Sequence, residues 1–240
     1  MHNLGQTRSA CRASHYLFTP DTFVRAPLPG MTAATAIVHV SPAAGAAFTQ
    51  YTVEFEAGGA LGPSRGQRFL YVTGGELSAG GRVLAAGHYA FFPEGCDAKV
   101  SARGTASAAV IEKQYRALEG TNAPAMLFGD ESAIAAAPLN GDAGIALRCL
   151  LPDQPAFDFA VNTMTYEPGA ALSQVEIHVM EHGLAMLQGG GIYRLDDAWY
   201  PVSAGDFIWM APYCPQWFGA LGKTPAKYLI YKDWNRHPLP

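Results

Sequence analysis

The amino-acid sequence of this chain repeats itself. Three segments of the first half are similar to three segments of the second half in their apolar positions, turns and aromatic residues. They occur in the same order in both halves, with an offset of between 111 and 119 residues. An internal repeat of this length predicts two copies of one structural unit. The paired segments are 51–61 with 162–172, 69–95 with 184–214, and 110–116 with 229–236.

Each copy has the pattern of short β-strands. Alternating apolar residues are interrupted by turn residues every 8–12 positions, a spacing typical of sandwiches and barrels. The 26 glycines and 17 prolines supply turns, and charged residues make up only 15% of the chain. A glycine turn, a strand, an Ala-Gly pair and an aromatic strand ending in proline are typical of a jelly roll or cupin. We predict an all-β bicupin of two tandem double-stranded β-helix (jelly-roll) domains, with an unrelated β-sandwich as the alternative.

The repeat also predicts the domain boundaries. Residues 1–119 would form the N-terminal domain, residues 120–144 a Gly-, Ala- and Pro-rich linker, and residues 145–240 the C-terminal domain. The first copy has no His, Asp or Glu between Ala57 and Gly75. We therefore expect the first domain to be metal-free and structural, and the second to carry the chemistry.

Composition excludes several classes of partner. The net charge of −4 does not indicate the positively charged surface that binds nucleic acid. No apolar run reaches the roughly 18 residues of a membrane span. The N-terminal segment lacks the apolar core of a secretory signal. Tandem jelly rolls expose sheet edges that often pair, so we expect a homo-oligomer. The cysteines are far apart, without a CxxC pair, and we expect buried, reduced thiols in a cytoplasmic protein: Cys11, Cys96, Cys149 and Cys214.

A candidate metal site lies in the second copy, in the segment QVEIHVMEHG (174–183). On a β-strand, Glu176, His178 and His182 have the same parity and would face one side. Ile177 and Val179 would then point into apolar packing. One carboxylate and two imidazoles form a ligand set for a divalent metal.

A helical metalloprotease motif is the alternative for this segment, but the residue after His178 is Val179 and not glutamate. A fourth ligand is expected from a neighbouring strand. Gln216 is the ligand-capable side chain in an apolar, aromatic stretch, and its amide oxygen can coordinate a cation. Two imidazoles, one carboxylate and one amide oxygen suit Mn²⁺, Fe²⁺ or Zn²⁺.

These residues belong to a longer pattern. The run ExHxxxHGxxxLxGxGxYxLxxxWxPVxAGDxIxMxPxxPQ extends from Glu176 to Gln216, and YLxYKDxNR follows from Tyr228 to Arg236. The pattern resembles the (S)-ureidoglycine aminohydrolase family, manganese-dependent bicupins of ureide catabolism. The resemblance is dense over the last ~80 residues, whereas the first copy is similar mainly in layout.

The resemblance implies a site and a reaction. Its metal ligands fall on Glu176, His178, His182 and Gln216. Its substrate-binding residues fall on Tyr193, Tyr228 and Lys232, with Glu176 and Lys232 as catalytic groups. The implied reaction converts (S)-ureidoglycine, a small polar ureide, and water to (S)-ureidoglycolate and ammonia, with Mn²⁺ as cofactor.

From the residues alone, other interpretations of these positions stay open. Tyr193 is also compatible with a core aromatic and Lys232 with a surface lysine, since Lys113 occupies a similar place in the first copy. Which catalytic group acts as the acid and which acts as the base is also open. At the level of the whole protein, a bicupin dioxygenase or isomerase, a small-molecule sensor and a storage protein are the alternatives, because a fold and a metal do not determine a reaction.

Overall fold

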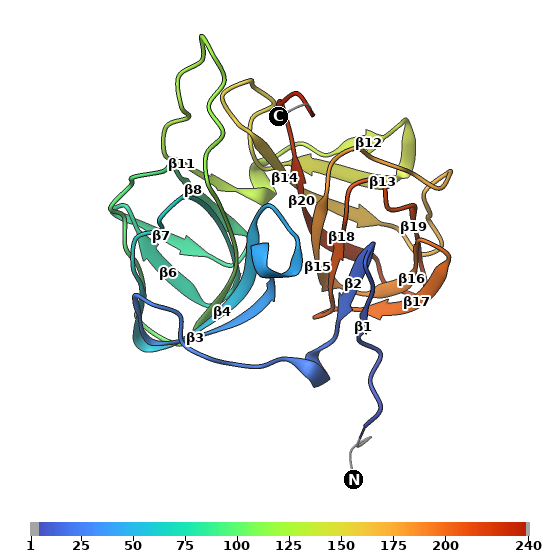
Figure 1. Ribbon diagram of the computed structural model, residues 1–240. Coiled ribbons are helices and arrows are strands. Elements are labelled where there is room, and N and C mark those ends of the chain that lie inside the picture. Colours follow the sequence, from blue (N-terminus) through green and yellow to red (C-terminus); the bar gives the residue numbers. More distant parts are fainter. Residues whose placement is uncertain (1–4, 239–240) are drawn as a thin grey trace. The chain divides into compact units, whose positions relative to one another are not determined.

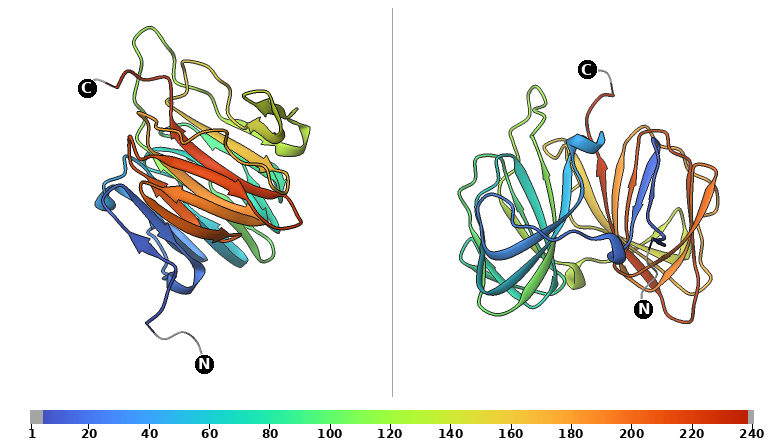
Figure 2. Two further views of the ribbon diagram at one scale, coloured as in Figure 1. Left: turned by 90° about the vertical axis from the view of Figure 1, so that its right-hand side faces the viewer. Right: turned by 60° about the horizontal axis from the view of Figure 1, so that its bottom comes forward.

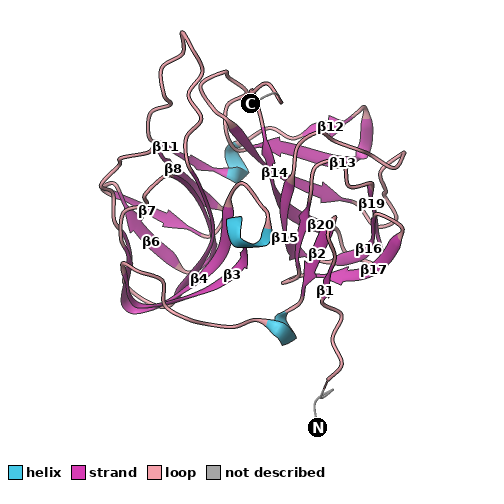
Figure 3. Ribbon diagram, viewed as in Figure 1, coloured by secondary structure: helices cyan, strands magenta, loops and turns pink. Residues whose placement is uncertain are grey.

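The computed structural model describes residues 5–238, and strands dominate it (Figure 3). Helical structure among these residues is restricted to three short 3₁₀ turns: η1 (Pro20–Thr22), η2 (Pro42–Ala44) and η3 (Glu131–Ala133). No helix in the described part of the chain is long and apolar enough to cross a membrane. The prediction of an all-β fold is confirmed.

The described residues form two compact units. The N-terminal unit contains residues 24–134 and 154–158, and the C-terminal unit contains 5–23, 135–153 and 159–238. These boundaries correct the predicted ones. Residues 5–23 belong to the C-terminal unit and not to the first domain, and the predicted linker 120–144 is divided between the units. Residues 1–4 and 239–240 of the predicted domains lie outside the described residues.

Strand pairing explains both differences. Within the C-terminal unit, β2 (His15–Phe18) pairs antiparallel with β18 (Phe207–Met210), so the beginning of the chain completes the second sheet. Within the N-terminal unit, β11 (Leu127–Asp130) pairs with β8 (His88–Phe92), so half of the predicted linker is part of the first sheet. Neither pairing belongs to the internal repeat, and the sequence pattern therefore did not indicate it.

The N-terminal unit is one curled sheet (Figures 1 and 2) with strand order β11-β8-β5-β10-β4-β9-β6-β7, and β3 also pairs with β4. Its interior is lined by alternate residues of these strands, including Val53, Leu70 and Val110. The remaining strands are β3 (Met31–Val40), β4 (Thr49–Leu61), β5 (Gln67–Gly74), β6 (Glu76–Ala79), β7 (Arg82–Ala85), β9 (Val100–Ala102) and β10 (Ala106–Lys113).

The C-terminal unit has a sheet of order β1-β2-β18-β15-β20-β14-β13-β12 and a smaller sheet of order β17-β16-β19. The order β18-β15-β20-β14 repeats the order β8-β5-β10-β4 of the N-terminal unit, so the sequence repeat is also a structural repeat. The remaining strands are β1 (Ala10–Cys11), β12 (Ala137–Leu139), β13 (Asp142–Cys149), β14 (Phe159–Tyr166), β15 (His182–Gln188), β16 (Gly190–Leu195), β17 (Ala198–Ser203), β19 (Gln216–Ala220) and β20 (Ala226–Asp233).

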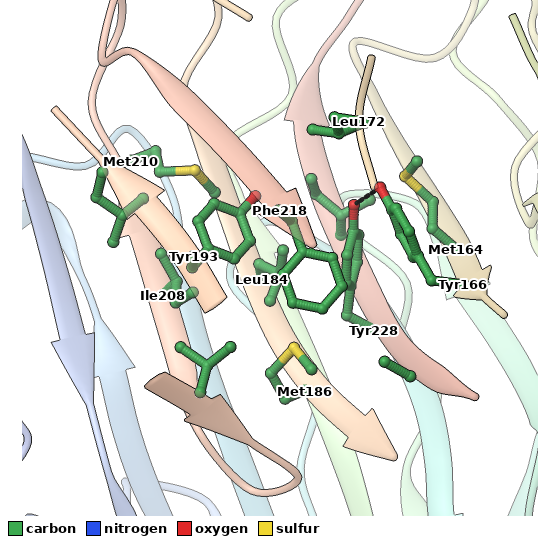
Figure 4. Packing of buried hydrophobic residues seen from close by; sticks show 14 of the residues in the cluster. Met164, Tyr166, Leu172, Leu184, Met186, Tyr193, Ile208, Met210, Phe218 and Tyr228 are labelled. Carbon is green, nitrogen blue, oxygen red and sulfur yellow. Dashed lines mark hydrogen bonds between the residues drawn. The ribbon is translucent and has the colours of Figure 1, made fainter. Parts of the chain in front are cut away.

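An apolar core fills the C-terminal unit (Figure 4). Because side chains alternate along a strand, even-numbered residues of β15 and β20 point inward, among them Leu184, Met186 and Tyr228. Phe218 from β19 packs edge-on against Tyr228, with ring centroids 5.7 Å apart. Complete burial of such large side chains stabilises the unit and holds the strands that carry the polar residues in place.

A glycine run allows the two sheets of this unit to meet. Gly189 turns the chain between β15 and β16 with φ of +64°, and a Cβ there would lie 2.5 Å from the Pro225 carbonyl oxygen. At Gly191 a Cβ would lie 2.1 Å from the carbonyl oxygen of Gly219 on β19. A side chain at position 191 would therefore force β16 and β19 apart.

The cysteines are all free, but they are less buried than predicted. Cys214 is buried in the C-terminal core and Cys96 is half-buried, whereas Cys11 and Cys149 are exposed. Strand ends explain the exposure, since Cys11 ends β1 and Cys149 ends β13.

We expect the Arg8→Met variant to destabilise the C-terminal unit. Arg8 donates from both terminal nitrogens, at 2.7 and 2.8 Å, to Asp206, whose side chain is fully buried. Removal of the guanidinium leaves a buried carboxylate with one remaining backbone donor, Ser203. We expect the free energy of unfolding to fall by about 1–2 kcal/mol.

Denaturant unfolding followed by tryptophan fluorescence measures this change, because all four tryptophans belong to the C-terminal unit. Arg12→Met is the matched control, since Arg12 is exposed on the same segment. Equal stability of the two variants would show that the Arg8–Asp206 pair contributes nothing.

Candidate metal centre

A cavity of about 390 Å³ opens in the C-terminal unit. It is lined by every site residue that the sequence indicated: Glu176, His178, His182, Tyr193, Gln216, Tyr228 and Lys232. Asn162, Met164 and Trp234 also line it, together with apolar residues from β12, β13 and β20. The fold therefore gathers into one cavity residues that are up to 56 positions apart in the predicted set.

The segment before β15 is not a strand, contrary to the sequence prediction. Apart from an isolated bridge, residues 174–181 are irregular, and β15 begins at His182. Ile177 and Val179 are 60% and 44% exposed and do not pack in the core. The bridge joins the backbones of Glu176 and Gln216, with N–O distances of 2.8 and 2.9 Å. This pair of hydrogen bonds brings Glu176 and Gln216 together, whereas parity on a strand had been expected to align Glu176 with His178 and His182.

His182 is the most constrained polar residue of the cavity. Its side chain is buried, its Nδ1 lies 3.3 Å from the Tyr231 carbonyl oxygen, and its Nε2 has no partner among the described residues. Burial lowers the pKa of His182 to about 3, so the imidazole is neutral at physiological pH. With the proton of Nδ1 donated to the carbonyl, the Nε2 lone pair is left for a ligand, the arrangement typical of metal-binding histidines.

Glu176 and His178 lie beside His182. The His178 Nε2 atom is 3.2 Å from the Glu176 Oε2 atom, and the rings of His178 and His182 meet edge-on with centroids 5.2 Å apart. Within residues 5–238, no three His, Cys, Asp or Glu side chains form a compact ligand cluster. Glu176 and His178 instead contact each other directly.

Gln216 begins β19 and is buried in the cavity wall. Its Oε1 atom accepts a hydrogen bond of 3.2 Å from the Tyr193 hydroxyl, whose position is set by tilted packing on Phe218. Tyr193 therefore orients the amide of Gln216, in addition to lining the cavity. The Gln216 oxygen has a second lone pair available to a cation.

Tyr228 contacts a tyrosine that the sequence did not indicate. Its hydroxyl lies 2.8 Å from that of Tyr166 on β14, the contact drawn as a dashed line in Figure 4. Burial raises the pKa of Tyr193 and of Tyr228 well above the usual value, so both hydroxyls stay protonated and act as hydrogen-bond donors.

Lys232 lies opposite His182 in the pairing of β20 with β15. Burial lowers the pKa of Lys232, and its Nζ lies 3.8 Å from the centre of the Trp234 ring. The neutral form of this amine is therefore populated at a lower pH than that of a surface lysine. Trp234 and Asn162 are cavity residues that the sequence reasoning missed, because a tryptophan directly after β20 and an asparagine within β14 give no distinct pattern.

The donor atoms of this cavity fit a divalent cation. A buried imidazole nitrogen without a partner, a second imidazole, a carboxylate and an amide oxygen line one space. Nitrogen and oxygen donors of this kind, without a thiolate, suit Mn²⁺, Fe²⁺ or Zn²⁺ and do not suit a structural zinc site.

Similarities to known proteins agree with this geometry. Residues 162–231 match the family described as "Cupin domain". A glyoxylate-induced protein from Pseudomonas aeruginosa, described as putative, has a solved structure that is 30% identical, with a TM-score of 0.89 over 99% of this chain and 94% of that one. Oxalate decarboxylase from Bacillus subtilis, a protein with Mn(II) centres, is 12% identical over 97% of this chain and 80% of that one, with a TM-score of 0.69. The second likeness shows the fold alone.

A curated plant protein shows the family to which the chain belongs. The (S)-ureidoglycine aminohydrolase of Arabidopsis thaliana is 38% identical over 242 aligned residues, which cover 98% of this chain and 80% of the relative. The similarity therefore includes both units and not only the second copy, where the motif lies. The chain belongs to the (S)-ureidoglycine aminohydrolase family.

Proposed function

We propose that this protein releases ammonia from (S)-ureidoglycine to give (S)-ureidoglycolate, as a metal-dependent enzyme of allantoin and purine degradation in the cytoplasm. Family membership supports the reaction. The observation that carries the proposal is the single cavity that holds four metal-ligand candidates, two protonated tyrosines and a buried lysine. Its volume of about 390 Å³ accommodates a small polar substrate with a carboxylate, an amine and a ureido group.

Glu176, His178, His182 and Gln216 would hold the cation, for which we propose Mn²⁺. A bound divalent cation supplies a positive charge that orients and polarises a substrate with anionic and carbonyl oxygens. The neutral state of His182 and the hydrogen bond from Tyr193 to Gln216 prepare two of the four ligands in advance. Preorganisation of this kind lowers the cost of assembling the site.

The reaction itself requires three proton transfers. When the carbon–nitrogen bond to the ammonium group breaks, its electron pair leaves with ammonia. The ureido nitrogen then forms a carbon–nitrogen double bond and loses its proton. Addition of water to that double bond reverses the process, because the nitrogen regains a proton and the attacking water loses one. The amine of Lys232 is our proposed carrier of the nitrogen proton, since burial lowers its pKa.

The remaining groups would accept the proton from water or position the substrate. The carboxylate of Glu176 is the acidic side chain that lines the cavity, and we propose it as the acceptor of the proton from water. Tyr193 and Tyr228 stay protonated because burial raises their pKa, so neither can act as a base. The Tyr228 hydroxyl can donate a hydrogen bond to a substrate oxygen, whereas the Tyr193 hydroxyl donates to Gln216 and would accept a hydrogen bond from the substrate. Water addition would then take place from the side that these residues leave open, which selects one stereoisomer.

Replacement of a ligand is expected to abolish tight metal binding. We expect His182→Ala to lower the affinity for Mn²⁺ by about 100-fold or more, since one of four donors is lost. Metal content after gel filtration and the Mn²⁺ electron paramagnetic resonance spectrum measure the change. His88→Ala, in the N-terminal unit, is the control. Unchanged metal content in His182→Ala would exclude His182 as a ligand.

Tyr193→Phe tests the support of Gln216. Loss of the hydroxyl removes the donor to the Gln216 amide oxygen but keeps the ring on Phe218, so we expect an affinity for Mn²⁺ about 10-fold lower with little change in stability. Titration with Mn²⁺ measures this. Tyr200→Phe is the matched control, because that hydroxyl bonds to His15 instead. A similar affinity in both variants would contradict the orienting role of Tyr193.

Lys232→Met tests the proton carrier. We expect ammonia release from freshly generated (S)-ureidoglycine to fall by roughly 10²–10⁴-fold in the Mn²⁺-loaded protein, the usual contribution of a general acid–base group. Lys227→Met, on the same strand but outside the cavity lining, is expected to keep normal turnover. Undiminished turnover in Lys232→Met would remove this residue from the scheme. A wild-type rate no higher than the spontaneous background would overturn the proposed function.

A further inference from the structure

The N-terminal unit has a polar cluster at the position that the metal centre has in the C-terminal unit. On β15 and β20, His182 pairs with Lys232 at the end of the sheet. On the equivalent strands β5 and β10, Arg68 pairs with Glu112.

The next inward-facing pairs confirm the equivalence. Leu184 pairs with Ile230 in the C-terminal unit, and Leu70 pairs with Val110 in the N-terminal unit. All four side chains are buried in their respective cores. The place of Lys232 is therefore occupied by Glu112 and not by Lys113, the residue suggested by sequence similarity.

Arg68 and Glu112 form a partly buried ion pair in the first sheet. The Nε and Nη2 atoms of Arg68 lie 2.7 and 2.6 Å from the Glu112 Oε1 atom. The Tyr51 hydroxyl donates to the same oxygen at 3.0 Å, and the Arg68 Nη1 atom donates to the Gly62 carbonyl oxygen at 2.7 Å. The Arg68 side chain is only 4% exposed, so its N–H groups have little access to water as a hydrogen-bond acceptor.

This arrangement leaves hydrogen-bond donors available. A guanidinium group has five N–H bonds, and the contacts above use three of them. The remaining two, one on each terminal nitrogen, have no protein acceptor among the described residues. Two adjacent N–H groups of an arginine match the two oxygens of a carboxylate.

A cavity of about 420 Å³ adjoins this pair within the N-terminal unit. Arg68, Glu112 and Tyr51 line it, and its other walls are largely apolar, including Leu28, Phe48 and Leu61. The lining carries three cationic side chains, Arg65, Arg68 and Lys113. Lys113 is paired with the buried Asp158 and Arg68 with Glu112, which leaves the positive charge of Arg65 in excess. This charge favours an anion, and the apolar walls favour a hydrocarbon body.

We propose that the N-terminal unit binds a small monocarboxylic acid with an apolar tail, with its carboxylate against Arg68 and its tail against the apolar walls. The site is separate from the metal centre, and the proposal does not depend on the proposed function. The first unit is then a second ligand-binding unit of the chain, in place of the purely structural role that its sequence suggested.

Isothermal titration calorimetry of the full-length, metal-loaded protein with butyrate and phenylacetate tests the proposal, with butyramide as the neutral probe. Ala47→Trp places a bulky side chain on an exposed residue of the cavity lining without altering the ion pair. Ala43→Trp is its matched control, since Ala43 is exposed nearby but does not line the cavity. Binding that is removed by Ala47→Trp and kept by Ala43→Trp reports this site, whatever the C-terminal unit binds.

We expect each chain to bind one molecule of butyrate or phenylacetate at this site, and we expect butyramide to give no heat of binding there. Arg68→Lys keeps the charge but removes the paired donors, so its affinity should fall by at least about tenfold. Arg25→Lys, at the exposed ion pair with Glu54, should have no effect. The proposal is overturned if butyrate and phenylacetate bind wild type and Ala47→Trp with the same stoichiometry and affinity, or if butyramide binds as well as butyrate.

Discussion

The antiparallel pairing of β15 with β20 is the constraint on which the site depends. It sets His182 opposite Lys232 and, two residues further along, Leu184 opposite Ile230. Since side chains alternate across a sheet, a slip of one residue in this register would turn the imidazole and the amine away from the cavity together. The apolar pairs that follow them prevent such a slip, because it would also expose Leu184 and Ile230. Packing of the core thus determines where the His182 and Lys232 side chains lie at the ends of β15 and β20.

Burial gives the cavity its chemical character. It lowers the pKa of His182 and of Lys232 and raises the pKa of Tyr193 and Tyr228. In each case the charged form is penalised, so the His182 imidazole is neutral, the phenols stay protonated and Lys232 loses its proton more readily than a surface lysine. A neutral nitrogen ligand, hydroxyl groups and an amine able to exchange a proton thus arise from burial, without a dedicated charge partner for each group.

The two units show how one strand arrangement can carry different polar residues at equivalent positions. Both share the order of four central strands, and equivalent register positions face inward at the end of each sheet. In the C-terminal unit these positions hold His182 and Lys232, whereas in the N-terminal unit they hold Arg68 and Glu112, which neutralise much of each other's charge. Because the register is common to both units, the residue at each position decides what the cavity binds.

Much of this protein was predictable from local patterns. The repeat and the spacing of the strands indicated the fold class, and the motifs at 176–216 and 228–236 indicated seven of the residues that line the cavity, because these signals lie in residues close together in the sequence. The route by which Glu176 reaches Gln216 was not predictable: an irregular segment and a backbone bridge bring them together, and Ile177 is exposed. The membership of residues 5–23 in the C-terminal unit and the pairing of Arg68 with Glu112 also required the tertiary structure. Strand pairing and register arise from contacts between distant segments, and no local pattern of side chains records them.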